Sequence, residues 1–209
     1  MSATGEELAS KPFVDGQKVL VNGQVLPFVG TCLDVTSPIL DSAGNRIQLG
    51  IMAQMLETEA LAAVGAAKGA FKNGAGQWPQ MKMEERITAI QALVEELKKM
   101  RSQIINVLMW EICKNTTDAA AEFDRTMSFI EATIATIRSV DEANCYKTVS
   151  GTMGKYRRAA IGCMLAMGPF NYPFNETYTT LIPSLLMGNT IVMKIPVRVL
   201  RLYYTLIHL

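Results

Sequence analysis

The residues best suited to chemistry follow an apolar run, residues 159–167, which has the length of a buried strand. Asn171 lies just after this run, and Pro173 suits the first turn of a helix that follows. Open parallel sheets bind ligands at the carboxyl edge of their strands. The Asn171 amide can therefore donate a hydrogen bond to an oxygen that gains negative charge in a reaction. It can equally cap the helix, and spacing alone leaves both roles open.

Other kinds of catalysis are excluded by residue type. The single histidine is His208, so serine–histidine–aspartate and cysteine–histidine catalysis have no base, and a histidine-bearing zinc site is not expected. The four cysteines form no C-x-x-C pair, which gives no metal or disulfide framework and indicates reduced thiols. They are Cys32, Cys113, Cys145 and Cys163.

The elements that must position Asn171 form a strand–helix–strand unit. A helix over residues 174–187 follows the apolar run and is stopped by Gly188, and a second apolar strand spans residues 190–194. Two strands joined by a helix pair in parallel, so the fold class is α/β. We expect the strand at residues 159–167 to be buried on both faces.

The preceding residues predict strands and then long helices. Two turns, Asn22-Gly23 and residues 42–45, separate short extended segments. Apolar residues at helical spacing predict helices over residues 55–71, 83–113 with a break near Arg101, and 118–138, with Trp78-Pro79 in a loop. Residues 141–158 read as a hairpin-like arm with strands at 146–149 and 155–158.

The segment P-F-N-Y-P at residues 169–173, followed by a helix and by P-x-L-x-x-G-N-x-x-V-x-K at residues 183–194, resembles the aldehyde dehydrogenase superfamily. The resemblance covers residues 12–196. It implies the start of a Rossmann-like parallel sheet, with the N-terminal strands and helices of the cofactor-binding domain at residues 1–140. It also implies that residues 141–158 are an oligomerisation arm and that residues 159–209 are the first, incomplete βαβ unit of the dinucleotide-binding sheet.

The resemblance implies a role for single residues. Asn171 matches the amide that forms the oxyanion hole together with the backbone N–H of the family's nucleophilic cysteine. Lys194 matches the lysine that reaches the adenosine ribose, although it can also be a solvated lysine at a strand end. Pro169 and Phe170 match positions at the cofactor.

A branch of the family is also indicated. Residues 122–126 and 175–180 resemble enzymes that oxidise glyceraldehyde 3-phosphate with NADP, without phosphorylation. In that branch an arginine and the tyrosine after the oxyanion asparagine hold the substrate phosphate, and Arg125 and Tyr172 match them. Arg125 points away from the apolar stripe of its helix, and an arginine fork suits a phosphate. The alternatives are a solvated arginine and a tyrosine that only packs.

The resemblance fades after residue 196. Val197 stands where an acidic residue would exclude the 2′-phosphate, and Arg198 follows, so NADP is expected, with NAD possible. No cysteine here has a context like that of the family's nucleophile, and the general-base glutamate is missing. We therefore expect this chain alone to be an inactive fragment. One alternative is a non-catalytic binding or assembly subunit that pairs with a full-length enzyme through the arm, and another is an unrelated small Rossmann-like protein.

Composition and charge indicate which partners and which cellular location to expect. The chain has 209 residues, 49% of them hydrophobic, and a net charge of +1. This charge balance gives no reason to expect nucleic acid or a membrane as a partner, and no leader or spanning segment is evident. We expect a cytoplasmic protein with a small-molecule aldehyde substrate and no bound metal, and a homo-oligomer in the full-length family member.

Overall fold

The computed structural model describes residues 10–142, 146–155 and 157–195. The expectations for Cys145, Val197, Arg198 and His208 lie outside these residues. Helices and strands alternate in blocks along the chain, in the order β1 (Val14–Gly16), β2 (Lys18–Val21), β3 (Gln24–Pro27), β4 (Cys32–Leu40), β5 (Arg46–Ala53), α1 (Glu57–Phe71), η1 (Lys72–Gly74), α2 (Gln77–Gln80), α3 (Met83–Lys99), α4 (Arg101–Ile112), α5 (Thr116–Glu142), β6 (Lys147–Val149), β7 (Thr152–Gly154), β8 (Cys163–Met167), α6 (Pro173–Leu186) and β9 (Thr190–Lys194).

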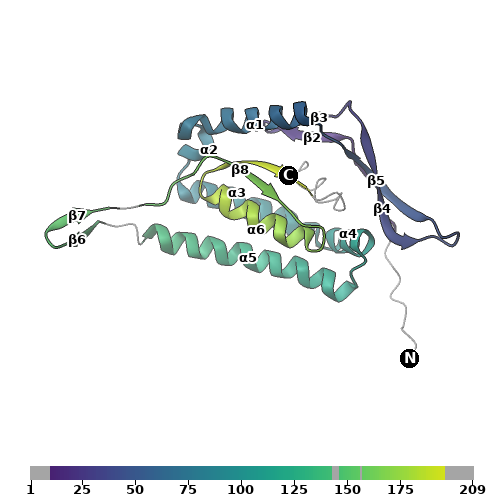
Figure 1. Cartoon of the computed structure of the whole chain (residues 1–209). Helices are drawn as coiled ribbons and strands as arrows, with labels where there is room; N and C mark the ends of the chain where they lie inside the picture. The colour runs from purple at the N-terminus through teal and green to yellow at the C-terminus, as the bar shows by residue number, and fades with distance from the viewer. Residues whose placement is uncertain (1–9, 143–145, 156, 196–209) are drawn as a thin grey trace.

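The N-terminal strands form two small sheets at one end of the molecule (Figure 1). β2 and β3 pair as an antiparallel hairpin whose turn residues, Asn22 and Gly23, have φ values of 52° and 72°. β4 pairs antiparallel with β5, and β1 adds parallel to β5. Both predicted turns are confirmed. The Asn22-Gly23 pair tolerates the positive φ angles that a two-residue hairpin requires, and the turn at residues 42–45 joins β4 to β5 with Gly44 at φ 84°.

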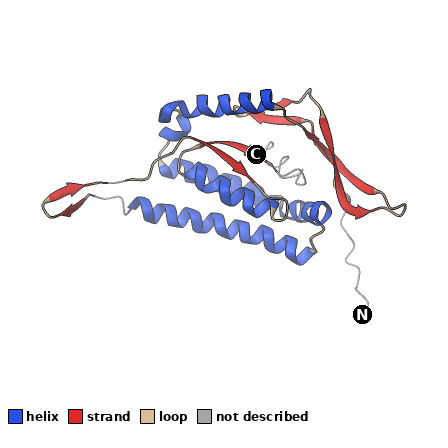
Figure 2. Cartoon of the chain, in the orientation of Figure 1, coloured by secondary structure: helices blue, strands red, loops and turns tan. Residues whose placement is uncertain are grey.

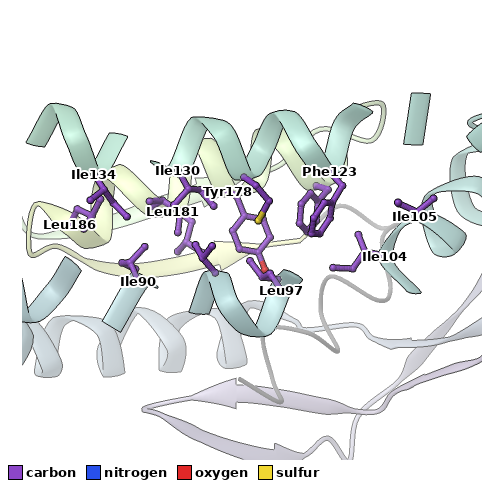
Figure 3. Packing of buried hydrophobic residues seen from close by; sticks show 14 of the residues in the cluster. Ile90, Leu97, Ile104, Ile105, Phe123, Ile130, Ile134, Tyr178, Leu181 and Leu186 are labelled. Atoms are coloured by element: carbon purple, nitrogen blue, oxygen red, sulfur yellow. The ribbon is translucent and has the colours of Figure 1, made fainter. Parts of the chain in front are cut away.

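The helices α3 to α6 pack side by side and hold the main hydrophobic core (Figures 2 and 3). The apolar stripe of α3, with Ile87, Ile90 and Leu97, faces α6, as the periodicity predicts. The predicted break near Arg101 is confirmed at Met100, which separates α3 from α4. Within the described ranges, no helix has both the length and the apolar character that crossing a membrane requires.

The segment around Trp78 corrects one expectation. Trp78-Pro79, predicted to lie in a loop, belongs to the short helix α2. The Trp78 indole N–H donates to the carbonyl oxygen of Leu185 at 3.0 Å, which fixes this segment against α6. A contact between residues so far apart in the chain is not visible in local periodicity.

The predicted arm is a hairpin that projects from the helical body (Figure 1). Its first strand, β6, falls within the predicted range. The second strand was expected at residues 155–158 and is instead β7, directly after the turn. Ser150 and Gly151, at φ 49° and 78°, form a two-residue turn, so the pairing strand must begin at once.

β8, α6 and β9 form the predicted strand–helix–strand unit, and the two strands pair in parallel. β9 has the predicted bounds, but β8 begins only at Cys163. The expectation that this strand is buried on both faces is wrong, because Leu165 and Met167 are 60% and 62% exposed. Among the described residues β8 pairs on one edge only, with β9, and its neighbours leave part of one face open. Apolar composition alone could not show this.

Candidate functional site

The carboxyl ends of β8 and β9 meet at one edge of the parallel pair. Met167, the last residue of β8, lies opposite Lys194, the last residue of β9. Asn171 follows four residues after the end of β8, in the segment that leads into α6. The fold therefore brings the two ends of the sequence pattern, 23 positions apart in the chain, to the same edge.

The segment between β8 and α6 is open to solvent. Pro169, Phe170, Asn171 and Tyr172 are all exposed, with Phe170 at 65% and Tyr172 at 40%. Tyr172 is the N-cap residue of α6, and its side chain makes no capping hydrogen bond. The alternative in which the Asn171 side chain caps α6 is contradicted, because another residue binds the amides of this turn.

That residue is Glu122, on α5. Its Oε1 atom accepts hydrogen bonds from the backbone N–H groups of Phe174 at 2.9 Å and Asn175 at 3.1 Å. Pro173, at the first helical position, has no N–H to satisfy. The carboxylate is buried and lies at the positive end of the helix dipole, so one side chain satisfies the free donors of the first turn.

Lys114 balances the charge of Glu122. Its ammonium forms an ion pair with Oε2 of Glu122, and the two side chains are 14% and 0% exposed. The same ammonium lies 3.9 Å from the centre of the Tyr172 ring, within the range of a cation–π contact. Lys114 thus joins the carboxylate that caps α6 to the aromatic ring that precedes it.

α5 makes a further contact one turn beyond Glu122. The Asn175 side-chain amide donates to the hydroxyl oxygen of Thr126 at 3.1 Å, and that hydroxyl donates to the carbonyl oxygen of Glu122 at 2.7 Å. Phe174 stacks on Phe123 with ring centres 5.3 Å apart. The first turn of α6 is therefore fixed to α5 by polar and aromatic contacts together.

Arg125 lies on α5 with its side chain exposed, as expected from its place off the apolar stripe. It follows Glu122 by three positions, so the two side chains are neighbours on the helix surface. The cation that contacts the Tyr172 ring among the described residues is nevertheless Lys114. Sequence reasoning missed Lys114 and Glu122. The signal for Glu122 was a charged residue next to Phe123, on the buried side of an amphipathic helix.

The other end of α6 is closed by Asn189. Its Oδ1 atom accepts hydrogen bonds from the backbone N–H groups of Ile161 at 2.6 Å and Gly162 at 3.0 Å. Its side-chain amide donates to the carbonyl oxygen of Ser184 at 3.0 Å. The G-N pair of the sequence pattern is thus a structural device that joins the end of α6 to the approach to β8.

Arg86 from α3 also binds this end. Its Nε–H donates to the carbonyl oxygen of Leu186 at 2.9 Å, and Nη1 donates to the carbonyl oxygen of Met81. Burial lowers the pKa of the Arg86 guanidinium, and the Asp141 carboxylate acts in the opposite direction. Arginine remains charged at neutral pH despite such a shift, so its positive charge faces the negative end of the helix dipole.

None of the three described thiols lies in the segment between β8 and α6. Cys163 begins β8, about 13 Å from the end of that strand at 3.3 Å per residue. Cys32 begins β4, and Cys113 is the C-cap residue of α4. The segment before α6 therefore offers an amide donor and the end of β9 offers a lysine, and neither of these two stretches contains a cysteine. The N–H groups of Phe174 and Asn175 are bound by Glu122 and are not free to hold a phosphate.

Comparison with known proteins gives consistent matches. Residues 32–208 match the sequence profile of the aldehyde dehydrogenase family. The chain is 29% identical over 154 residues to the NADP-dependent glyceraldehyde-3-phosphate dehydrogenase of Streptococcus equinus, covering 71% of this chain and 32% of that enzyme. It is 28% identical over 132 residues to malonate-semialdehyde dehydrogenase 2 of Shouchella clausii, covering 63% and 26%.

Solved structures show the same fold. The NADP-dependent glyceraldehyde-3-phosphate dehydrogenase of Bacillus halodurans C-125, complexed with NADP, matches with a TM-score of 0.73 and 25% identity. The match covers 92% of this chain and 40% of that chain. The matched part of this chain therefore spans about a quarter to two fifths of the length of these relatives.

Proposed function

The chain belongs to the aldehyde dehydrogenase family, and from this premise we propose that it forms part of an NADP-dependent enzyme that oxidises glyceraldehyde 3-phosphate to the acid. Residues 1–140 and 159–209 would belong to its cofactor-binding domain. The observation that carries the proposal is the shared carboxyl edge, where the Asn171 segment and Lys194 lie at adjacent strand ends.

Asn171 is the proposed oxyanion donor. Its side chain is exposed and the helix after it is already capped by Glu122, which leaves the amide available to a ligand. When a thiolate adds to an aldehyde, the carbonyl oxygen gains negative charge, and an amide N–H aimed at it stabilises the intermediate. Removing one such donor typically slows catalysis by about 100- to 1,000-fold.

Lys194 is the proposed cofactor contact, with Pro169 and Phe170 beside the same edge. Its exposed ammonium at the end of β9 fits the ribose of a dinucleotide, which binds across the carboxyl edge of such sheets. Bound NADP would supply the hydride acceptor. The names of two relatives specify NADP, which supports NADP over NAD as the preferred cofactor.

Arg125 and Tyr172 are the proposed contacts of the substrate phosphate. Both are exposed, and Arg125 is a helix neighbour of the residue that caps α6. A guanidinium and a phenol can together bind an anionic oxygen through several hydrogen bonds. Phosphate specificity then depends on two side chains from different elements, one within α5 and one in the segment before α6.

We also propose that this chain alone does not acylate aldehydes, because no cysteine lies in the segment between β8 and α6 that carries Asn171, and none has a context like that of the family's nucleophile. A specific observation favours a second role, as an assembly subunit. The arm projects from the helical body, and its apolar residues Tyr146, Val149 and Met153 are 66–69% exposed (Figure 1). Such a strand pair suits contact with another subunit, either of this chain or of a full-length enzyme.

A binding titration tests the cofactor proposal. Isothermal titration of the purified chain with NADP is expected to show binding, with weaker binding of NAD, and Lys194→Ala should weaken the NADP affinity. Lys99→Ala is the matched control, since Lys99 is an exposed lysine on α3. Equal affinity of the wild type and Lys194→Ala would contradict the assignment of Lys194.

An activity assay tests the rest of the proposal. The chain mixed with NADP and glyceraldehyde 3-phosphate is expected to give no increase in NADPH absorbance. Turnover by the chain alone would refute the claim that its nucleophile is missing. Analytical ultracentrifugation of the chain, with and without residues 146–155, tests the assembly role, and an unchanged mass distribution would count against it.

A further inference from the structure

The segment that carries Asn171 is held at its α6 end by two contacts, one from α5 and one from the loop before α5. Glu122 binds the N–H groups immediately after the segment, and Lys114 lies against the ring of Tyr172 within it. These two side chains also bind each other. The contacts form a closed chain, so the end of the segment next to α6 cannot move without disturbing the ion pair.

We propose that Lys114 and Glu122 are a positioning pair that sets the conformation of residues 170–172, and thereby the direction in which the Asn171 amide and the Tyr172 phenol are presented. The catalytic meaning of this pair rests on the proposed function. The contacts themselves do not, so the pair can be tested without cofactor or substrate.

Burial makes the two side chains act together. The Glu122 carboxylate is 0% exposed and the Lys114 side chain 14%, so each charge depends on the other for compensation. Loss of one partner leaves an uncompensated charge, which a protein avoids by rearranging. If Glu122 releases α6, Lys114 must find another partner and leaves the Tyr172 ring. The position of the ring is thus coupled to the capping of the helix.

A simple helix cap would explain only half of this arrangement. A carboxylate at the positive end of α6 needs no lysine, because the helix dipole already favours negative charge. The lysine adds the contact with Tyr172, at 3.9 Å from the ring centre. Glu122 also occupies the amides that would otherwise attract an anion at a helix N-terminus. Contact of this segment with an anionic ligand is therefore left to its side chains, including those of Asn171 and Tyr172.

Nuclear magnetic resonance on the whole chain separates the two functions of Glu122. In Glu122→Ala, hydrogen exchange of the Phe174 and Asn175 amides is expected to accelerate by at least about tenfold, because their acceptor is gone. The upfield ring-current shift of the Lys114 ε-methylene protons should disappear as well. In Glu122→Gln the side-chain carbonyl still accepts from both amides, so their protection is expected to be largely retained while the Lys114 shift is lost.

The matched control is Glu131→Gln, an exposed glutamate on the same helix that pairs with Lys98. It should change neither signal. The decisive signals are the side-chain resonances of Asn171 and Tyr172, which should shift or broaden in both Glu122 variants and in Lys114→Met, and stay in place in the control.

Wild-type positions for Asn171 and Tyr172 in Glu122→Gln and Lys114→Met would overturn the proposal and reduce Glu122 to a helix cap. Glu122→Gln keeps the volume of the side chain, so it decides the question even if Glu122→Ala does not fold. Failure of NADP binding in the titration described above would refute the proposed function and leave these measurements unaffected.

Discussion

The two ends of α6 use the same electrostatic principle for different purposes. At the N-terminal end a buried carboxylate, Glu122, faces the positive end of the helix dipole, and at the C-terminal end a buried guanidinium, Arg86, faces the negative end. The C-terminal end is closed, because the Asn189 side chain accepts a hydrogen bond from the N–H of Ile161 and donates one to the carbonyl oxygen of Ser184. At the N-terminal end, the buried Glu122 side chain holds the first turn from the side of α5. The segment before this turn, which includes Asn171, is exposed to solvent.

This difference separates the two halves of the sequence pattern. The G-N half serves the fold, because Asn189 joins the end of α6 to the residues before β8. The F-N-Y half precedes a helix turn that is also well anchored. Its residues Asn171 and Tyr172 are nevertheless exposed. A residue that belongs to a family pattern can therefore be retained for packing or for chemistry, and only its contacts distinguish the two cases.

The largest effect on stability is expected at the C-terminal end of α6. Arg86→Met should lower the free energy of unfolding by about 3 kcal/mol, because the buried carbonyl groups of Leu186 and Met81 lose their donor. Urea denaturation followed by circular dichroism measures it. Arg138→Met, which breaks an exposed pair with Glu84, should leave the transition in place. Equal effects of the two substitutions would show that Arg86 is not an anchor.

Asn189→Ala is expected to lower the free energy of unfolding by about 2 kcal/mol, since two backbone N–H groups lose their acceptor. Asn175→Ala at the other end removes one side-chain hydrogen bond, to Thr126, and should cost about 1 kcal/mol. Urea denaturation of both variants compares the ends directly. A larger loss for Asn175→Ala would reverse the comparison.

Gly188→Ala should cost about 1–2 kcal/mol, because Gly188 has φ +88°, where a side chain is strained. The added Cβ would also lie 3.4 Å from Nη1 of Arg86. Gly65→Ala is the control, in the interior of α1 with open space around it, and it should stabilise the chain by about 0.5–1 kcal/mol. Thermal unfolding shows whether the two substitutions shift the midpoint in opposite directions.

The smallest effect on stability is expected in the exposed segment before the N-terminal end of α6. Asn171→Ala should change the free energy of unfolding by less than about 0.5 kcal/mol, because an exposed side chain outside the core contributes little. Urea denaturation measures it beside Asn189→Ala. A loss comparable to that of Asn189→Ala would mean that Asn171 is structural, which would break the contrast between the two ends.

Local patterns in the sequence were sufficient to predict most of the longer elements, although α2 was not predicted. The periodicity of α3 and α5, the Asn22-Gly23 turn and the bounds of β9 all depend on residues within a few positions of one another. The strand after Ser150 was misplaced, because the two-residue turn starts pairing earlier than composition indicated. The burial of β8 was also misjudged, since it depends on which neighbours cover each face.

The candidate site was predictable only in part. Asn171 and Lys194 follow from a pattern with fixed spacing, and their placement at one edge follows from parallel pairing. Glu122 and Lys114 were missed, because Glu122 acts on an amide 52 residues away in the chain. The available signal was a charged residue within an apolar stripe. Such a residue indicates a buried charge but does not show which group it binds.

The sequence by itself determined most of the elements, the family and the residues whose types suit the chemistry, because these are set by local spacing and by a pattern of fixed positions. Only the tertiary structure decided that Asn171 does not cap α6, that Glu122 does so, and that Lys114 reaches the Tyr172 ring. The physical reason is that charges and donors are satisfied across space, by whichever side chain the packing of α5 against α6 brings within hydrogen-bond distance.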